Sequence, residues 1–251
     1  MKRRDFLSGS AALGISLATC EFHPTSAQMT KTSEGKKAST AAAFDYRLTP
    51  PEKGSIPVAF LISEGATVID FAGPWEVFQD VHVPSRGQSM EEQMPFQLFT
   101  VSDTTDVVTG SAGLKIVPDY TFKNAPSPRV VVIPAQGGRS PEMFAWLLKV
   151  SETADVIMSV CTGAFILGRS GLLKGKSATT HHDFIDRFVK QFPDIDVKRG
   201  LRFVENPKIS SAGGLTSGID LALRVVDRYF GRQVAERTAY YMEYQSKGWI
   251  V

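Results

Sequence analysis

Cys161 is the residue of this chain with the clearest chemical potential. It ends the apolar, β-favouring run Asp155–Val160, and the small residues Thr162, Gly163 and Ala164 then open a helical pattern. A sharp turn between a strand and a helix lifts a side chain out of the sheet, as in a nucleophile elbow. N–H groups at the start of the helix favour the thiolate, which is the reactive form of cysteine. The alternative is a small buried core side chain, a common role of free cysteines.

Backbone donors are predicted near this thiol. Gly137 and Gly138 follow the buried apolar run Arg129–Pro134, and glycine lets backbone N–H groups approach a ligand closely. Together with the N–H of Thr162 they are predicted to form an oxyanion-type hole. For the two glycines an ordinary turn at a strand end is the alternative.

Asp70 follows the first apolar run, Ile56–Ile62, and two roles fit it. It could be the acid/base partner of the thiol. It could also cap the helix that is predicted to begin at Gly73 and Pro74. Sequence spacing does not decide between these roles.

His181 is the histidine that could lie beside Cys161 and steady its thiolate, and a surface position is the alternative. Its neighbour His182 is expected to point in a different direction, so the pair is a poor metal site. No other cluster has metal-ligand spacing, and no glycine fingerprint for nucleotides occurs. We therefore predict neither a metal nor an organic cofactor.

Apolar strands that alternate with amphipathic helices must position these residues. The predicted strands cover residues 56–62, 96–101, 129–134 and 155–160, with two short ones between 202 and 212. The predicted helices begin at residues 73 and 140 and cover residues 184–192, 218–230 and 233–244. This order predicts an α/β fold, a three-layer sandwich around a mostly parallel sheet. Ligands bind such sheets at the carboxyl ends of strands, where both the Gly-Gly turn and the cysteine fall.

Residues 1–27 resemble a twin-arginine export signal. Arg3 and Arg4 precede a short apolar segment rich in small residues. The segment is too short to span a bilayer, so we expect export to the periplasm or another extracytoplasmic place without a membrane span. Cleavage after Ala27 is favoured, and a lipid anchor on Cys20 is the alternative.

Residues 28–53 are rich in Ser, Thr, Lys and Ala and are predicted to form a flexible linker, and residues 54–251 a single domain. Residues 1–50 hold seven Lys/Arg and four Asp/Glu, a net charge of +3. Because the whole chain carries +2, the rest carries −1. The basic charge therefore does not indicate a nucleic-acid partner. The domain holds a single cysteine, so it cannot form an internal disulfide.

Several segments spread over residues 56–244 carry a family pattern. They are Asp70-Phe71-Ala72-Gly73-Pro74-Trp75, Ile133-Pro134-Ala135-Gln136-Gly137-Gly138, Ser159-Val160-Cys161-Thr162-Gly163-Ala164, Ala178-Thr179-Thr180-His181 and Gly218-Ile219-Asp220-Leu221-Ala222-Leu223. The pattern resembles the ThiJ/DJ-1/PfpI superfamily, and within it the isonitrile hydratase branch. The resemblance implies a flavodoxin-like, class I glutamine amidotransferase-like fold and a homodimer.

The same resemblance implies roles for single residues. Cys161 matches the family nucleophile, and Asp70 falls where the isonitrile hydratase branch carries an essential aspartate. Thr162 stands where protease-like members have a histidine, which argues against a peptidase. His181 matches a position near the nucleophile in several relatives. The segment Ala135-Gln136-Gly137 departs from the more usual Pro-Gly-Gly.

The reaction implied is the hydration of a small isonitrile to an N-substituted formamide. Thiolate Cys161 attacks the terminal carbon, a protonated Asp70 supplies a proton, and water activated by the same carboxylate then releases the product. Two other functions remain open. One is a ligand-sensing domain like that of AraC-type regulators, and the other is a stress-protective thiol protein acting on reactive carbonyls.

Overall fold

A computed structural model describes residues 46–251 of the chain. The predicted export signal, its cleavage site, Cys20 and most of the predicted linker lie outside the described residues. None of the helices in the described part is long and apolar enough to cross a membrane.

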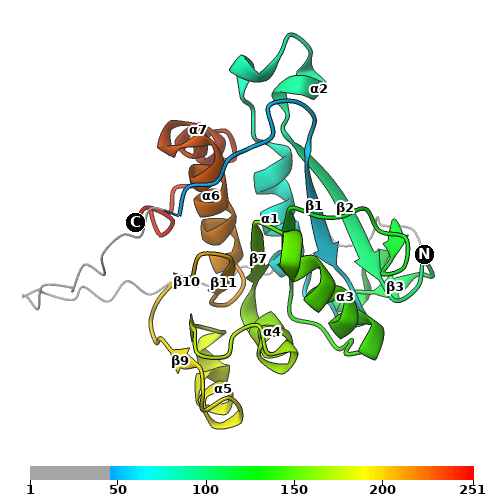
Figure 1. Cartoon of the computed structure of the whole chain (residues 1–251). Coiled ribbons are helices and arrows are strands. Elements are labelled where there is room, and N and C mark those ends of the chain that lie inside the picture. Colours follow the sequence, from blue (N-terminus) through cyan, green and yellow to red (C-terminus); the bar gives the residue numbers. More distant parts are fainter. Residues whose placement is uncertain (1–45) are drawn as a thin grey trace, which may run out of the picture. The chain divides into compact units, whose positions relative to one another are not determined.

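Residues 46–251 are built on a seven-stranded sheet with the order β10-β11-β7-β6-β1-β2-β5 (Figure 1). Neighbouring strands are parallel except for the pair β10 and β11, which is antiparallel. The strands are β1 (Ile56–Leu61), β2 (Phe96–Ser102), β5 (Tyr120–Thr121), β6 (Val130–Ile133), β7 (Val156–Ser159), β10 (Phe203–Glu205) and β11 (Ile209–Ala212). The predicted mostly parallel sheet is confirmed, because continuous apolar runs suit strands that are buried on both faces.

Alternate residues of the central strands enter two separate cores. Val130 and Val132 of β6 pack with α1 (Val68–Gln79), α6 (Ser217–Phe230) and α7 (Arg232–Tyr241) on one face. On the other face, Val131 and Ile133 pack with α3 (Pro141–Thr153), α4 (Ala164–Ser170) and α5 (Ile185–Gln191). The helix–sheet–helix arrangement is the predicted three-layer sandwich.

Short elements complete the described part of the chain. They are α2 (Met90–Gln93), the two-stranded pairs β3 (Val108–Thr109) with β4 (Lys115–Ile116) and β8 (Ser177–Ala178) with β9 (Asp196–Val197), and the 3-10 turns η1 (Pro84–Arg86), η2 (Ser111–Gly113), η3 (Cys161–Gly163) and η4 (His182–Phe184).

Helix α1 begins five residues earlier than predicted, at Val68 instead of Gly73, and Pro74 lies inside it. No local side chain caps its start. Instead, the N–H of Thr67 donates to Ala135 O (2.8 Å) and that of Val68 to Ser111 Oγ (3.0 Å). Because these acceptors come from distant segments, the true start of the helix has no local sequence signal.

The last part of the predicted linker belongs to the packed domain. Leu48 N donates to Arg228 O (2.8 Å), and Arg228 Nε donates to Tyr46 O (2.7 Å). Arg86 Nη1 donates to Pro51 O (3.0 Å). The prediction of a flexible linker is therefore wrong for residues 46–53, because two arginines far along the chain bind its backbone.

An ion pair between a buried carboxylate and a partly exposed arginine fixes the start of α6 to the segments around it. The carboxylate of Asp220 is fully buried and accepts a hydrogen bond from Arg202 Nε (2.5 Å) and one from Ser246 Oγ (3.1 Å). Arg202 also donates to Thr216 Oγ1 (3.2 Å) and to Tyr244 Oη (3.3 Å). The guanidinium thus joins β10, the loop before α6 and the C-terminal segment.

We expect Arg202→Ala to lower the free energy of unfolding by about 3–5 kcal/mol, because it leaves the buried Asp220 carboxylate without its counter-charge. The matched control is Arg199→Ala, whose ion pair with Asp186 is exposed and should contribute less than about 1 kcal/mol. Urea unfolding followed by circular dichroism measures both. Equal losses in the two variants would contradict the assigned role of the buried pair.

Candidate active site

Cys161 occupies a sharp turn between β7 and α4, as predicted. Val160 is extended, whereas Cys161 has a φ of 58°, in the left-handed region that residues other than glycine rarely adopt. Such a conformation costs about 1–3 kcal/mol and persists only where surrounding structure enforces it. The residue is buried, with 7% of its surface exposed.

Three neighbouring segments hold this turn in place. Cys161 N–H donates to Gly213 O (2.6 Å), and Cys161 O accepts from Thr180 Oγ1 (2.8 Å). A Cβ atom at Gly163 would lie 2.2 Å from Ile133 O, so the turn lies directly against the end of β6. The strained backbone at the thiol is therefore enforced by β6, by the loop after β11 and by the segment after β8.

Asp70 lies in the first turn of α1, and its side chain is fully buried. Its Oδ2 accepts a hydrogen bond from Ala135 N (3.1 Å), whereas Oδ1 is buried without a hydrogen-bond partner. The proposed capping role is wrong, because the carboxylate faces the end of β6 and the helix start is bonded elsewhere. The structure instead brings Asp70 to the thiol of Cys161, with which it interacts electrostatically.

The surroundings of Cys161 disfavour ionisation of its thiol. Burial, together with the negative charge of Asp70, raises the pKa of Cys161 to about 11, despite opposing interactions with the N–H and hydroxyl of Thr162 and the N–H of Leu215. Burial and the charge of Asp70 thus act against the predicted thiolate, while the N–H groups of Thr162 and Leu215 favour it. That prediction relied on the dipole of the helix that follows Cys161. However, α4 has only seven residues and begins after a 3-10 turn. The cost of removing the thiolate from water therefore exceeds what the N–H groups near the sulfur contribute.

The pKa of the neighbouring Asp70 carboxyl is also raised. Burial raises the pKa of Asp70 to about 6, although the nearby N–H groups of Ala135 and Leu215 and the thiol of Cys161 lower it. The two groups therefore titrate as a coupled pair, in which burial and mutual repulsion disfavour the doubly ionised state.

Gly137 and Gly138 do not form the predicted oxyanion hole. The N–H of Gly137 donates to Glu64 O (2.8 Å), and that of Gly138 donates to Ser63 Oγ (2.9 Å). Both donors are therefore occupied by the segment after β1. Of the three predicted donors, the N–H of Thr162 alone faces the sulfur.

Two donors at this site were not predicted. Ala135 binds the carboxylate of Asp70, and Leu215 faces both Asp70 and the thiol. Leu215 has a φ of 53°, a second left-handed residue at the same site. The pair Gly213-Gly214 just before it, at the start of a strongly periodic helix, was the signal that could have indicated this loop.

His181 lies near the loop of Leu215 but makes no hydrogen bond to Cys161 in the described part of the chain. Its Nδ1 accepts from Asp183 N (3.2 Å), and a Cβ atom at Gly214 would lie 2.1 Å from its Cδ2. Its ring stacks on that of His182, with centroids 4.3 Å apart and an interplanar angle of 25°. The prediction that the two rings point in different directions is wrong, because the chain enters a 3-10 turn here.

Comparison with known proteins establishes the family. Residues 57–228 match the DJ-1/PfpI family, and the chain belongs to it. Among solved structures, that of a ThiJ/PfpI family protein from Pseudomonas syringae superposes with a TM-score of 0.66 at 29% identity, covering 85% of this chain and 84% of that one.

Curated relatives include both an enzyme and regulators. The isonitrile hydratase of Pseudomonas putida is 29% identical over 195 residues, which are 76% of this chain and 79% of that protein. The HTH-type transcriptional regulator GbdR of Pseudomonas aeruginosa is 25% identical over 190 residues, 74% of this chain but 50% of the regulator. The family therefore does not by itself decide between catalysis and sensing.

We expect Asp70→Asn to lower the pKa of Cys161, because removing the carboxylate removes a charge that opposes thiol ionisation. Alkylation by iodoacetamide at pH 8 should become about three- to tenfold faster, since more thiolate is present but each thiolate is a weaker nucleophile. Mass spectrometry of the Cys161 peptide measures the rate, and Asp186→Asn, an exposed position, is the control. Unchanged or slower alkylation in Asp70→Asn would contradict the coupling.

Proposed function

We propose that this protein is a cysteine-dependent enzyme that hydrates an isonitrile to an N-substituted formamide. The observation that carries the proposal is the buried pair of Asp70 and Cys161, which holds one proton between an acid and a nucleophile. The similarity to an isonitrile hydratase over 76% of the chain supports the same reaction.

The first step joins the sulfur and one proton to the terminal carbon of the substrate. At neutral pH the Asp70 carboxylate takes the proton of the Cys161 thiol and delivers it to the isonitrile carbon while the sulfur forms a bond to that carbon. The product is a thioimidate, in which carbon carries one hydrogen, the sulfur and a double bond to nitrogen. Asp70 is then ionised again.

Hydrolysis of the thioimidate regenerates the enzyme. Asp70 takes a proton from a water molecule as the water oxygen attacks the thioimidate carbon, and passes this proton to the substrate nitrogen. The carbon–sulfur bond then breaks as the hydroxyl proton of the adduct is transferred through Asp70 to the sulfur, and the N-substituted formamide leaves. One water molecule has been added to one isonitrile, and neither step as written uses a metal or an organic cofactor.

Thr162 and Leu215 have a supporting part in this scheme. Their interactions with the sulfur lower the pKa of Cys161 and so oppose the effect of burial. Because negative charge grows on sulfur as its proton moves to Asp70, these donors act where the charge develops. The unpaired Oδ1 of Asp70 is available to the transferred proton or to water.

Ligand sensing is the second candidate, and the similarity to GbdR supports it. A thiol that is 7% exposed is compatible with a core position in a binding domain. A protective thiol acting on reactive carbonyls is a third candidate, and the similarity to an isonitrile hydratase favours hydration over it.

We also propose that the chain is exported and acts as a homodimer on a small molecule outside the cytoplasm. The Arg3-Arg4 pair and the following apolar segment support export, and membership in the DJ-1/PfpI family supports the dimer.

Purified protein supplied with cyclohexyl isocyanide should release N-cyclohexylformamide, detected by proton NMR. We expect Cys161→Ser and Asp70→Asn each to reduce kcat at least about a hundredfold, since each removes a group that makes or breaks bonds. The matched controls, Cys20→Ser and Asp186→Asn, should retain the parent rate. Binding of the isocyanide without turnover in the parent would favour sensing, and turnover of methylglyoxal alone would favour carbonyl protection.

The rate should also depend on pH through Asp70. The carboxylate must be ionised to accept the thiol proton, so kcat/KM should fall about tenfold per pH unit below its pKa of about 6. Protonation of Asp70 in acid does not destabilise the fold, so unfolding driven by Asp70 cannot cause this fall of kcat/KM at low pH. Its pKa is raised on folding, so its contribution to stability is full below pH 3.8 and is lost as the pH rises through about 6. A flat profile between pH 5 and 7.5 would contradict the assignment.

A further inference from the structure

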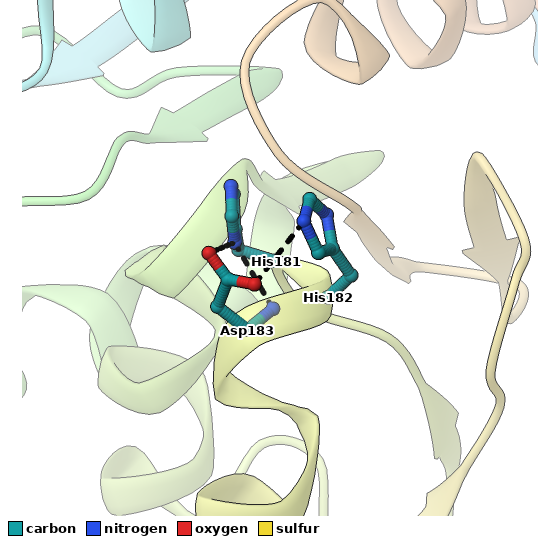
Figure 2. Close-up of side chains that lie close together, drawn as sticks. All are labelled: His181, His182 and Asp183. Carbon is teal, nitrogen blue, oxygen red and sulfur yellow. Dashed lines mark hydrogen bonds and ion pairs between the residues drawn. The ribbon is translucent and has the colours of Figure 1, made fainter.

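Three consecutive side chains converge just outside the site of Cys161. Donor atoms of His181, His182 and Asp183 all lie within 4.8 Å of one another, and Figure 2 shows both rings beside the carboxylate. The side chain of His181 is 16% exposed, whereas those of His182 and Asp183 are 84% and 69% exposed. The cluster thus combines a fixed inner ligand with two that solvent reaches freely.

The spacing of these atoms suits direct coordination of one ion. His182 Nε2 lies 3.2 Å from Asp183 Oδ1, and His181 Nδ1 lies 3.7 Å from Asp183 Oδ2. Ligands about 2.0–2.1 Å from a tetrahedral Zn²⁺ are separated from each other by about 3.4 Å. These two separations, measured to the two oxygens of one carboxylate, lie on either side of this value, and one donor atom of each residue lies within 4.8 Å of the others. Coordination of one ion therefore requires side-chain rotations that bring the three donor atoms closer together.

The protonation of His181 also suits a ligand. Its Nδ1 accepts the backbone N–H of Asp183, at 3.2 Å, so this nitrogen carries a lone pair and not a proton. A metal ion would replace this long hydrogen bond with a coordinate bond. The imidazole of His182 stacks on that of His181, and its Nε2 lies 3.2 Å from Asp183 Oδ1.

We propose that His181, His182 and Asp183 bind a divalent transition-metal ion of the Zn²⁺ class. Two imidazoles and one carboxylate are a ligand set that such ions prefer, and three protein ligands leave a coordination position open. Both histidines line a hollow of ≈380 Å³ together with Thr180, Arg202 and Leu215, so water or a small anion held there would complete the coordination.

The proposed metal site does not include the sulfur of Cys161, but His181 contacts the loop of Gly213–Leu215 beside that sulfur. The ring of His181 packs against Gly214. The residue before Gly214 is Gly213, whose carbonyl accepts the N–H of Cys161, and the residue after it is Leu215, which faces the thiol. The proposal needs no part of the isonitrile chemistry and can fail or stand independently of it.

Isothermal titration of ZnCl₂ into the chain tests the site directly. Cys20→Ser and Cys161→Ser form the background, so that no thiolate competes for the ion. We expect one Zn²⁺ per chain, weakened at least about tenfold by His182→Ala and by Asp183→Ala. Affinity should also fall below pH 6, because the imidazoles must be neutral to bind. Co²⁺ in place of Zn²⁺ should give a visible absorption band that both variants lose.

Two controls make the result decisive. His182 and Asp183 are exposed, so both variants should keep the thermal unfolding midpoint of the metal-free parent, whereas added Zn²⁺ should raise the midpoint of the parent alone. His82→Ala removes a histidine that bonds Gln93 Oε1 (2.7 Å) and not the cluster, and should leave the affinity unchanged. No binding, equal binding in His182→Ala and the parent, or loss of binding in His82→Ala would overturn the proposal.

Discussion

Asp70 and Cys161 face each other in a part of the domain from which water is largely excluded, so their ionisations are coupled. Two negative charges cannot be held there together, because neither is solvated and each destabilises the other. The pair therefore keeps one proton over a wide range of pH. That shared proton makes a weakly acidic thiol useful, since the base that activates it is already in place.

The remainder of the structure can be understood as what holds these two groups together. The strained turn at Cys161 is bonded to the loop after β11 and to the segment after β8, and Asp70 is bonded to the end of β6. The loop that carries Leu215 is itself joined by Arg202 to the start of α6. Each of these segments begins or ends at the carboxyl edge of the sheet, where open α/β folds bind their ligands.

Membership in the DJ-1/PfpI family defines the scaffold more sharply than the activity. Relatives of comparable similarity include an isonitrile hydratase and transcriptional regulators, so the function depends on the groups around the sulfur. Here these are Asp70, Thr162, Ala135 and the loop of Leu215. The segment Ala135–Gly138, which departs from the usual Pro-Gly-Gly, contains Ala135, whose N–H donates to the Asp70 carboxylate. The N–H groups of Gly137 and Gly138 donate instead to Glu64 and Ser63.

The sequence by itself determined the layers, the parallel strands and the turn at Cys161, because apolar periodicity and a strand-to-helix junction are local properties. It also indicated Asp70, beyond the first strand, as a possible partner of the thiol. Tertiary structure alone decided where α1 begins, which N–H groups face the sulfur, how strongly burial and charge disfavour ionisation of the thiol, and that His181 and His182 stack. Those outcomes depend on which distant segments meet and on how much water and charge remain around each group, and neither is encoded in the spacing of residues along the chain.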